Sequence, residues 1–318
     1  MAPHRVLVVG AGLTGAVAAS TLAKAGCEVR VVDKARGPGG RMASRRSDRG
    51  RFDHGAQSFT ARETAFIQRV RQWQAAGWVA PWVGRLACWD GDWSADRLRA
   101  PRWIATPRMS ALPRAVLGDI DTVFGVQVSS LRRLSDRIDV QTEIEELGGY
   151  DWVVVTAPAP QAAQLCRSAA PSVASVLENV AYRPCWAAMV TGEMGVPWDG
   201  ARVMRGPLSW VARQDTLPQR RGPERWVLHG SSSWSTAHLE EDPAVVGQRL
   251  SQVFSDMCGR PVLSVRAHRW RYARVVSPLA SEVLVEGRVV VAGDACSGSR
   301  VEGAWRSGRA AAARVLEG

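Results

Sequence analysis

The stretch His4-Arg-Val-Leu-Val-Val-Gly10-Ala-Gly-Leu-Thr-Gly15 decides the fold of this chain. A short β-branched, apolar run ends directly at the first glycine, and residues 13–25 continue as small and apolar residues that favour a helix. Residues 28–33, Glu-Val-Arg-Val-Val-Asp, return to strand character. The chain is therefore predicted to begin with a strand–helix–strand unit, the context in which a GxGxxG turn carries meaning.

Each glycine of such a turn has its own physical task. Gly10 permits the tight turn, Gly12 lets the backbone approach a pyrophosphate, and Gly15 allows the helix to pack closely on the strand. The helix N-terminus then offers N–H donors to an anion. Asp33 ends the second strand, where a carboxylate would hold an adenosine ribose hydroxyl. These features predict a dinucleotide site that would suit NAD and FAD equally.

The next motif separates the two cofactors. Gly37-Pro-Gly-Gly40-Arg41-Met42 lies just beyond Asp33; its glycines bring backbone close to a diphosphate, and Arg41 offers a forked cation to the oxygens. In this spacing the chain resembles the FAD-binding signature of the amine oxidase and desaturase superfamily of flavoproteins. The resemblance implies non-covalent FAD on a Rossmann-like domain of the p-hydroxybenzoate hydroxylase and amine oxidase type. It also places residues 52–59 beside the isoalloxazine.

A second stretch of this kind lies near the C-terminus. Val289-Val-Val-Ala-Gly293-Asp294 ends a strand, and Val301-Glu-Gly-Ala304 opens the last helix. The resemblance implies that Asp294 accepts a hydrogen bond from a ribityl hydroxyl. The last helix would aim its N-terminus at the flavin N1–C2=O edge, where charge accumulates on reduction. Two motifs at opposite ends of the chain therefore predict FAD binding.

The expected FAD site combines these motifs with the loop on the flavin side. Its residues are Gly10, Gly12, Leu13, Thr14, Gly15, Asp33, Lys34, Gly40, Arg41, Met42, Gly55, Ala56, Gln57, Val126, Gly293, Asp294, Val301, Glu302, Gly303 and Ala304. Cys296 lies near the second motif, but without the local pattern of relatives that tether their flavin, so we expect no covalent link.

Several further motifs are similar to the renalase family, especially its bacterial members. They are Asp53-His-Gly-Ala-Gln57, Trp103-Ile-Ala-Thr-Pro-Arg-Met-Ser-Ala-Leu112, His268-Arg-Trp-Arg-Tyr-Ala273, Gly293-Asp-Ala-Cys296 and Val301-Glu-Gly-Ala-Trp305. The resemblance implies oxidation of dihydro-NAD(P) isomers reduced at C2 or C6, giving NAD(P)+ and, with O2, hydrogen peroxide. Since the dihydropyridine becomes aromatic as it loses hydride, positioning near flavin N5 matters more than a strong base.

Around this substrate we expect Gln57, His229, Trp234, Trp270 and Tyr272, the last four on strands of an inserted sheet that faces the flavin. A packed or surface histidine is an equally good interpretation of His229. Trp270 and Tyr272 stand at i and i+2, on one face of a strand, so core packing is a rival interpretation for both.

Three other functions remain open. In amine oxidases of the superfamily a lysine commonly contacts flavin N5 through water, but no lysine follows Lys34 here, which weakens an amine substrate. A desaturase would favour a long apolar tunnel, which the polar, tryptophan-rich inserts do not provide. A non-catalytic flavin-binding protein is the remaining flavoprotein alternative. A plain NAD-dependent dehydrogenase conflicts with both FAD motifs.

Composition bounds the partners and the setting. The net charge is +11, yet the basic residues are almost all arginines scattered along the chain, so we expect anionic small molecules rather than nucleic acid. No CxxC pair and no metal-ligand spacing of histidines occurs, so no metal is expected. No apolar run suits a signal peptide or a membrane span. We expect a cytoplasmic protein, a monomer or weak dimer, that binds a dinucleotide and O2.

The distribution of polar, aromatic and strand-forming residues along the chain indicates two domains. Residues 1–63, 108–165 and 275–318 are expected to form the FAD-binding domain, and residues 64–107 and 166–274 an antiparallel-sheet substrate domain. Twelve of the fourteen tryptophans lie in this second set. Further expected elements are a helix at 109–116, strands at 122–129, 137–142, 151–156 and 288–292, and a last helix at 304–316.

Overall fold

A computed structural model describes residues 3–95 and 101–318 of the chain. It divides into two compact units. Unit 1 comprises Met1–Gly40, Ala111–Ala181 and Arg274–Gly318, and unit 2 comprises Arg41–Ser110 and Tyr182–Ala273.

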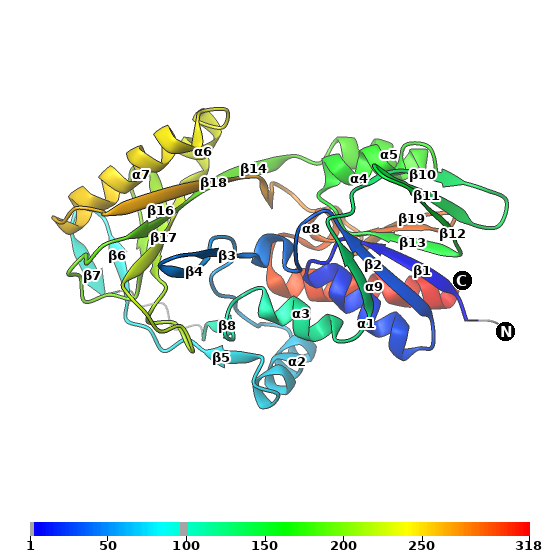
Figure 1. The fold of residues 1–318 in the computed structure, drawn as a ribbon, viewed down its shortest axis with the longest axis horizontal. Helices are drawn as coiled ribbons and strands as arrows, with labels where there is room; N and C mark the ends of the chain where they lie inside the picture. The colour runs from blue at the N-terminus through cyan, green and yellow to red at the C-terminus, as the bar shows by residue number, and fades with distance from the viewer. Residues whose placement is uncertain (1–2, 96–100) are drawn as a thin grey trace. The chain divides into compact units, whose positions relative to one another are not determined.

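Unit 1 is built on a six-stranded sheet in the order β19-β20-β13-β1-β2-β9 (Figure 1). The strands are β1 (Arg5–Val9), β2 (Glu28–Asp33), β9 (Asp121–Phe124), β13 (Trp152–Val155), β19 (Val283–Glu286) and β20 (Val289–Ala292). All neighbours run parallel except β19, which pairs antiparallel with β20 at the edge. The valine-rich strands β1, β13 and β20 are almost fully buried, as expected for a parallel sheet covered on both faces.

The helices of unit 1 bury small apolar side chains against this sheet. α1 (Leu13–Lys24) follows β1 and packs against the C-terminal helix α9 (Val301–Glu317). Ala16, Ala19, Ala311 and Ala312 are buried in the core cluster that these two helices share. The remaining elements are α3 (Ala111–Leu117), α4 (Ala159–Cys166), α5 (Pro171–Glu178), α8 (Asp294–Ser297) and the antiparallel sheet of β10 (Val128–Arg133), β11 (Ile138–Thr142) and β12 (Glu146–Tyr150).

Unit 2 contains a seven-stranded sheet in the order β18-β14-β17-β16-β15-β6-β7. Its strands are β6 (Leu86–Trp89), β7 (Trp93–Ala95), β14 (Tyr182–Thr191), β15 (Gly200–Val203), β16 (Leu208–Arg213), β17 (Arg225–Gly230) and β18 (Ser264–Val275). The β15–β6 pair is parallel, whereas β14, β17, β16 and β15 pair antiparallel in turn. The sheet is therefore mixed, because the earlier segment adds its strands at one edge.

The two faces of this sheet are covered differently. α7 (Pro243–Cys258) covers one face, where Leu250 and Phe254 pack with Trp226 and other buried side chains. The other face receives the hairpin of β3 (Ser44–Ser47) and β4 (Gly50–Asp53), whose Phe52 packs with Met189 and Val227. We call this second side the hairpin face. Unit 2 also holds the 3-10 turn η1 (Gly40–Met42), α2 (Thr64–Ala75), α6 (Ser232–Ala237) and the β5–β8 pair (Val79–Pro81 and Trp103–Ala105), with η1 starting on the unit boundary.

The expected fold class is confirmed: a Rossmann-like domain carries inserted segments that form a second sheet. One of the expected strands is divided in the structure, and several helices were not expected. The run 122–129 is two strands, β9 and β10, because Gly125 turns the chain at a φ of +77°. Helices α2, α5, α6 and α7 lie in regions where only polar, tryptophan-rich or strand-like texture was noted.

The compact units also differ from the expected domains. Residues 41–63 belong to unit 2, because the β3–β4 hairpin packs on the sheet of that unit through Phe52. Residues 166–181 belong to unit 1, because the backbone N–H groups of Ser172 and Val173 donate to Glu286 on β19. Within the described ranges, no helix is both long enough and apolar enough to span a membrane.

Candidate active site

Two glycines of the turn in unit 1 leave no room for a side chain. Gly10 has a φ of +110°, and its N–H donates to the Val32 carbonyl over 2.8 Å. A Cβ added at Gly15 would lie 1.9 Å from the Gly10 carbonyl oxygen, so only glycine lets α1 start this close to β1. A Cβ at Gly12 would lie 4.0 Å from the Gly40 Cα, which is an ordinary contact, so the prediction for Gly12 depends on a bound pyrophosphate.

A second glycine-rich segment runs beside this turn. The Gly39 N–H donates to the Ala11 carbonyl over 2.9 Å, and Gly12 and Gly39 form a parallel bridge. Gly40 has a φ of +52°, and a Cβ there would lie 3.4 Å from the Gly12 Cα. Bare backbone at the N-terminus of α1 thus forms a cradle that fits a diphosphate.

Asp33 orders the loop around this cradle. Its Oδ2 accepts the Ala11 N–H over 2.7 Å and its Oδ1 accepts the Ala35 N–H over 2.8 Å. The Val126 N–H donates to the Asp33 carbonyl over 3.2 Å, which brings Val126 next to the end of β2. Each carboxylate oxygen can accept a further hydrogen bond, so Asp33 still fits a ribose hydroxyl.

The C-terminal motif is equally tight. Gly293 has a φ of +131° and its N–H donates to Ser307 Oγ over 2.8 Å, so α9 is anchored to the end of β20. A Cβ at Gly303 would lie 2.2 Å from the Ser297 carbonyl oxygen. The buried Asp294 side chain accepts a hydrogen bond from Ser299 Oγ over 3.2 Å. Strand end, acid and helix start are thus locked together, as an FAD motif requires.

Cys296 is buried just after this motif. Its Sγ donates to the Val291 carbonyl over 3.8 Å, and burial raises the pKa of the thiol to about 12. A buried, protonated thiol is a poor nucleophile. This agrees with the expectation of a non-covalent cofactor.

In unit 2 the residues expected beside the flavin meet at one loop. The Ala56 N–H donates to the Arg41 carbonyl over 2.9 Å, and a Cβ at Gly55 would lie 2.0 Å from that oxygen. Arg41 Nη1 donates to the Tyr272 carbonyl over 3.4 Å. Met42, which follows Arg41 in the chain, is buried. The loop that holds Gly55 and Ala56 is therefore fixed to both Arg41 and β18.

Gln57 is held in a defined orientation. Trp210 Nε1 donates to Gln57 Oε1 over 3.1 Å, so the amide NH2 is turned toward His229, whose Nε2 lies 3.3 Å from Gln57 Nε2. His229 Nε2 also lies 3.2 Å from the carbonyl oxygen of His54. Gln57 and His229, two of the predicted substrate residues, are thus in direct contact on the hairpin face.

Aromatic side chains on and beside β18 lie next to this contact. The ring centroids of His54 and Trp270 are 5.1 Å apart, those of His268 and Trp270 are 4.5 Å apart, and Trp270 Nε1 donates to the His54 carbonyl over 2.9 Å. Tyr272 packs edge-on against Tyr182 at 5.4 Å. Trp270 and Tyr272 therefore share the hairpin face with Gln57 and His229.

The two other histidines of this group are uncharged at neutral pH. Burial lowers the pKa of His54 to about 3, with the charge of His268 as the next cause. Burial also lowers the pKa of His268 to about 4, and the positive charges of Arg45 and Arg266 lower it further. The surface is consequently aromatic and hydrogen-bonding, with two imidazoles that titrate far below neutrality.

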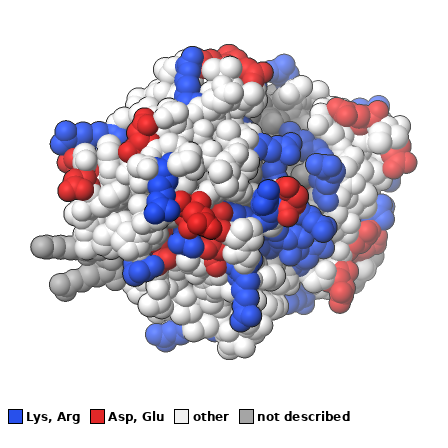
Figure 2. Space-filling model, turned by 60° about the vertical axis from the view of Figure 1, so that its left-hand side comes forward, with Lys and Arg blue, Asp and Glu red and all other residues white. Residues whose placement is uncertain are grey.

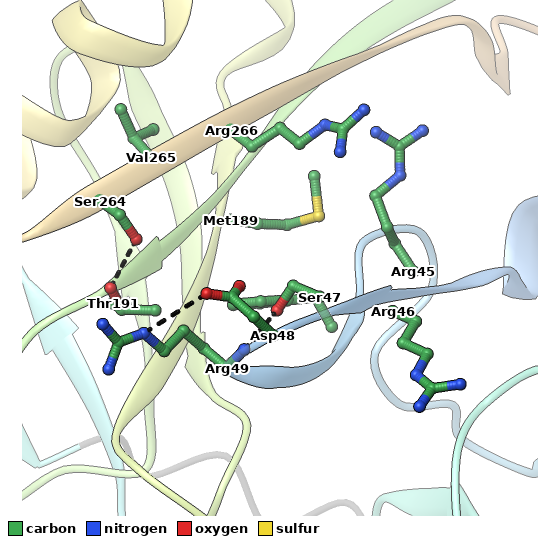
Figure 3. Close-up of a pocket in the computed structure, with 11 residues that line it drawn as sticks. Arg45, Arg46, Ser47, Asp48, Arg49, Met189, Thr191, Ser264, Val265 and Arg266 are labelled. Atoms are coloured by element: carbon green, nitrogen blue, oxygen red, sulfur yellow. Dashed lines mark hydrogen bonds and ion pairs between the residues drawn. The ribbon is translucent and has the colours of Figure 1, made fainter.

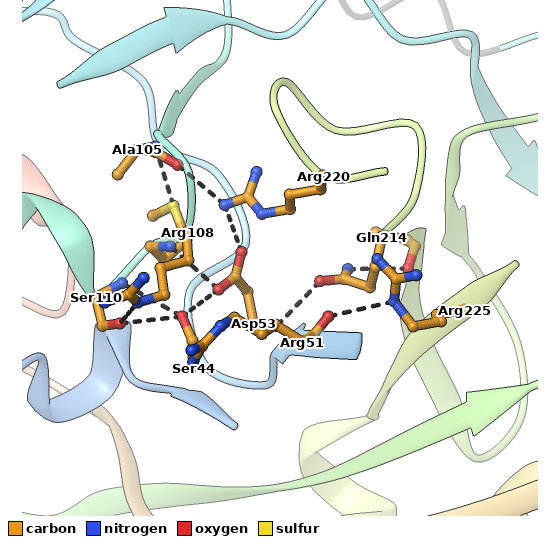
Figure 4. A network of polar contacts seen from close by, with 11 residues as sticks. Ser44, Arg51, Asp53, Ala105, Arg108, Ser110, Gln214, Arg220 and Arg225 are labelled. Atoms are coloured by element: carbon orange, nitrogen blue, oxygen red, sulfur yellow. Dashed lines mark hydrogen bonds and ion pairs between the residues drawn. The ribbon is translucent and has the colours of Figure 1, made fainter. Parts of the chain in front are cut away.

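A buried ion pair supports the start of the loop, as Figure 4 shows. Arg220 Nη2 lies 2.5 Å from Asp53 Oδ2 and 3.0 Å from the Ala105 carbonyl. Asp53 Oδ1 accepts from Ser44 Oγ and from the Met109 N–H, and the Asp53 N–H donates to Gln214 Oε1. Residue 53 is therefore tied to several segments of unit 2 just before His54 and Gln57.

The structure contradicts the expected position of Trp234. This tryptophan lies on α6, not on a strand, and packs with His238 at 4.3 Å in the cluster of the α7-covered face. The Ser-rich run 231–236 follows β17 and turns into a helix, which ends the strand at Gly230. Trp210, His54 and His268 occupy the hairpin face instead. The i, i+2 alternation from Trp270 back to His268 was the sequence signal for His268.

The expected FAD residues are divided between the units. Unit 1 holds Gly10, Gly12, Leu13, Thr14, Gly15, Asp33, Lys34, Gly40, Val126, Gly293, Asp294, Val301, Glu302, Gly303 and Ala304, and unit 2 holds Arg41, Met42, Gly55, Ala56 and Gln57. The described residues contain no group of three or more His, Cys, Asp or Glu side chains that could hold a metal ion.

Two family models match the chain at the two motifs. The NAD(P)-binding Rossmann-like domain matches residues 8–72, and the flavin containing amine oxidoreductase matches residues 228–316. Renalase from Mus musculus is 24% identical over 87% of this chain and 86% of its own length. Hydroxyneurosporene desaturase from Rubrivivax gelatinosus is 48% identical, but over 19% of this chain and only 11% of its own length.

Solved structures show the same fold. A putative protoporphyrinogen oxidase from Exiguobacterium sp. 255-15 aligns over 100% of both chains with a TM-score of 0.80 at 14% identity. Cyclohexylamine oxidase from Brevibacterium oxydans IH-35A aligns over 99% of both chains with a TM-score of 0.79 at 12% identity. These identities are low, so the similarity concerns the fold alone.

Geometry and matches together point to one class of protein. They support a flavin-dependent oxidoreductase of the amine oxidase superfamily, of the oxidase or desaturase type, with FAD as its cofactor. The renalase match runs through nearly the whole chain, whereas the desaturase match is confined to a short segment.

Proposed function

We propose that this protein oxidises the C2- or C6-reduced isomers of dihydro-NAD(P) with FAD as its cofactor. When bound, FAD would supply the hydride acceptor of the reaction, and O2 would take up the two electrons as hydrogen peroxide. The substrate loses one hydride, becomes aromatic and leaves as NAD(P)+. The observation that carries the proposal is the aromatic, amide-lined hairpin face formed by Gln57, His229, Trp270 and Tyr272.

The chemistry of a dihydropyridine fits these side chains. Because hydride loss restores aromaticity, the protein has to hold the ring at near-attack distance, about 3–3.5 Å, and need not remove a proton. Trp270 offers a flat ring for stacking. A polar ring substituent such as a carboxamide would hydrogen-bond through the second N–H or lone pair of the Gln57 amide or through the imidazole of His229.

The ionisation of the site points the same way. His54 and His268 have pKa values of about 3 and about 4, so both stay neutral and neither can collect protons near pH 7. A cationic substrate would gain nothing from neutral imidazoles. The chain also has no lysine beyond Lys34, the residue type that contacts flavin N5 through water in amine oxidases of the superfamily. A neutral reduced nicotinamide suits this surface better than an amine.

The decisive test is anaerobic mixing of the holoprotein with candidate reductants. Dihydro-NAD reduced at C2 or C6 should bleach the flavin absorbance rapidly, and air should then restore the colour with formation of hydrogen peroxide. The C4-reduced isomer is the matched control, since it has the same groups and charge. Bleaching by primary or secondary amines alone would make the protein an amine oxidase, and bleaching by none would favour a desaturase or a non-catalytic flavoprotein.

Two further properties complete the proposal. We place the enzyme in the cytoplasm, where reduced pyridine nucleotides arise, and expect a monomer or weak dimer. Size-exclusion chromatography with light scattering over a concentration series measures the second property. A constant dimer mass at the lowest concentration would contradict it.

A further inference from the structure

Unit 2 contains a pocket rich in arginine that the proposed chemistry does not use (Figure 3). Its volume is about 180 Å³, several times the roughly 30 Å³ that a water occupies in the liquid, so a phosphate group fits. The β3–β4 hairpin supplies one wall, and β14 and β18 supply the other. The polar side chains that line it include Arg45, Arg46, Arg49, Thr191, Ser264 and Arg266.

The charge of the pocket is strongly positive. Four arginines line it, against the single acid Asp48, whose Oδ2 lies 3.8 Å from Arg49 Nε. The guanidinium groups of Arg45 and Arg266 point toward one another in Figure 3, although they come from different elements. Like charges that converge on one hollow create an attractive potential for an anion.

Hydroxyl groups complete the lining. Thr191 Oγ1 and Ser264 Oγ lie 2.6 Å apart, on β14 and β18. One of these hydroxyls donates to the other, which leaves one O–H to donate to an oxygen anion, and arginine forks match phosphate oxygens in pairs. The donor set is therefore that of a phosphate site and not of a carboxylate-bound metal.

The pocket lies in line with the substrate residues. Arg266, His268, Trp270 and Tyr272 occupy alternate positions of β18 and so share the hairpin face. Four residues of strand separate Arg266 from Trp270, or about 13 Å at 3.3 Å per residue. The positive charges of Arg45 and Arg266 lower the pKa of His268, so both arginines lie near this imidazole. His268 stands between Arg266 and Trp270 on β18.

We propose that the arginine pocket binds the phosphates of the dinucleotide substrate while its nicotinamide end lies at Trp270. This inference rests on the proposed function, because it assigns the second half of the same substrate. A dinucleotide carries its phosphates one sugar or more away from the nicotinamide ring, which matches a separation along one strand. The pocket therefore selects the dinucleotide over the corresponding riboside, which has no phosphate.

A nucleic acid is a poorer occupant of these arginines. Figure 2 shows basic side chains in several groups on the face drawn, with acidic side chains among them. A nucleic-acid footprint is instead a continuous basic stripe. A small pocket with four arginines suits a discrete phosphate group.

The first experiment compares substrates with and without phosphate. The C2- or C6-reduced isomers of dihydro-NAD and of dihydronicotinamide riboside are mixed with the anaerobic holoprotein, and kcat/KM for flavin reduction is taken from the concentration dependence. The dinucleotide should be favoured at least tenfold. Arg266→Gln should reduce this preference about tenfold, equivalent to about 1.4 kcal/mol. Arg249→Gln, on the helix that covers the opposite face, removes the same charge and should keep the wild-type preference.

The second experiment needs no turnover. Inorganic pyrophosphate is titrated into the holoprotein by calorimetry, where bound FAD already fills the glycine cradle. Wild type and Arg249→Gln should bind it, and Arg266→Gln and Arg45→Gln should bind it about tenfold more weakly; flavin content confirms that each variant is folded. Equal pyrophosphate affinity in all four proteins, or equal use of riboside and dinucleotide, would overturn the phosphate site. If no isomer reduces the flavin, the proposed function fails, and pyrophosphate binding alone still decides the pocket.

Discussion

Asp53 and Arg220 form an ion pair in the interior of unit 2, with Arg220 Nη2 2.5 Å from Asp53 Oδ2 and side chains only 1% and 4% exposed. Burial lowers the pKa of Arg220, and the charge of Asp53 opposes that shift. Asp53 directly precedes His54 in the chain and is followed a few residues later by Gln57. The pair therefore fixes the start of a loop that carries residues predicted to contact the flavin and the substrate.

Breaking this pair should destabilise the protein strongly. Arg220→Met leaves a buried carboxylate without its counter-charge, which costs about 3–5 kcal/mol. Asp53→Asn strands the guanidinium in the same way. The double variant should lose less than the sum of the two single losses, as measured by urea unfolding of the holoprotein. Strictly additive losses would show that the two side chains do not interact.

The orientation of Gln57 should matter for catalysis. Trp210→Phe keeps an aromatic side chain but removes the indole N–H that donates to Gln57 Oε1, so the amide can rotate away from His229. A hydrogen bond of this kind is worth about 1 kcal/mol, and kcat/KM for the isomeric dihydro-NAD should fall about fivefold. Trp93→Phe is the control, because its indole donates to the Met257 carbonyl on the other side of the sheet. An equal loss in both variants would assign the effect to general packing.

Gly308 should be irreplaceable for packing in unit 1. A methyl group there would lie 2.5 Å from the Thr14 carbonyl oxygen and 2.9 Å from the Val17 Cβ, so α9 must move away from the start of α1. Gly308→Ala should lose about 1–3 kcal/mol of stability despite the better helix propensity of alanine. The flavin-to-protein absorbance ratio should fall as well. Arg309→Ala, at the exposed neighbouring position, should change neither; full flavin content in Gly308→Ala would refute the prediction.

The buried imidazoles should make stability depend on pH in acid. An unfolded histidine has a pKa of about 6.5, whereas His54 and His268 titrate at about 3 and about 4 when folded. Between these values the unfolded chain binds more protons, so stability falls as pH drops from about 6.5 toward 3. Above pH 6.5 these two groups contribute no pH dependence.

Substitution isolates this contribution from that of the carboxylates. His268→Gln should flatten the decline of the urea midpoint between pH 6 and pH 4, whereas His4→Gln, at an exposed position, should not. The rate of flavin reduction should show no inflection from His54 or His268 between pH 5 and pH 9. A slope unchanged by His268→Gln would show that this imidazole protonates in the folded state as readily as in the unfolded chain.

The FAD-binding half of the protein is largely readable from local sequence. Gly10, Gly12 and Gly15 follow a valine-rich strand, and Gly293-Asp294 follows another, so the strand–turn–helix geometry is encoded by neighbours in the chain. The helices α2 and α7 were not predicted, because the tryptophan and turn residues around them suggested a sheet. The local sequence also assigned residues 41–63 to the FAD-binding domain, although Phe52 packs on the sheet of unit 2.

The substrate side depends on contacts that sequence spacing does not reveal. Trp234 and Trp210 are the same residue type, so the sequence alone does not distinguish their positions. The helix after Gly230 carries Trp234 to the α7-covered face, whereas β16 presents Trp210 to Gln57. The contact between Gln57 and His229 joins residues 172 positions apart. Burial, which sets the pKa values of His54 and His268, follows from such long-range packing.

Unit 1 is assembled from three separate segments, and this has a consequence for biosynthesis. The central strand β13 gains its neighbour β20, and α1 gains its partner α9, only from the last part of the chain. During translation the glycine turn therefore leaves the ribosome long before the elements that complete its support. We expect FAD capture to be a late, post-translational event, and C-terminal truncations that remove α9 to yield colourless protein.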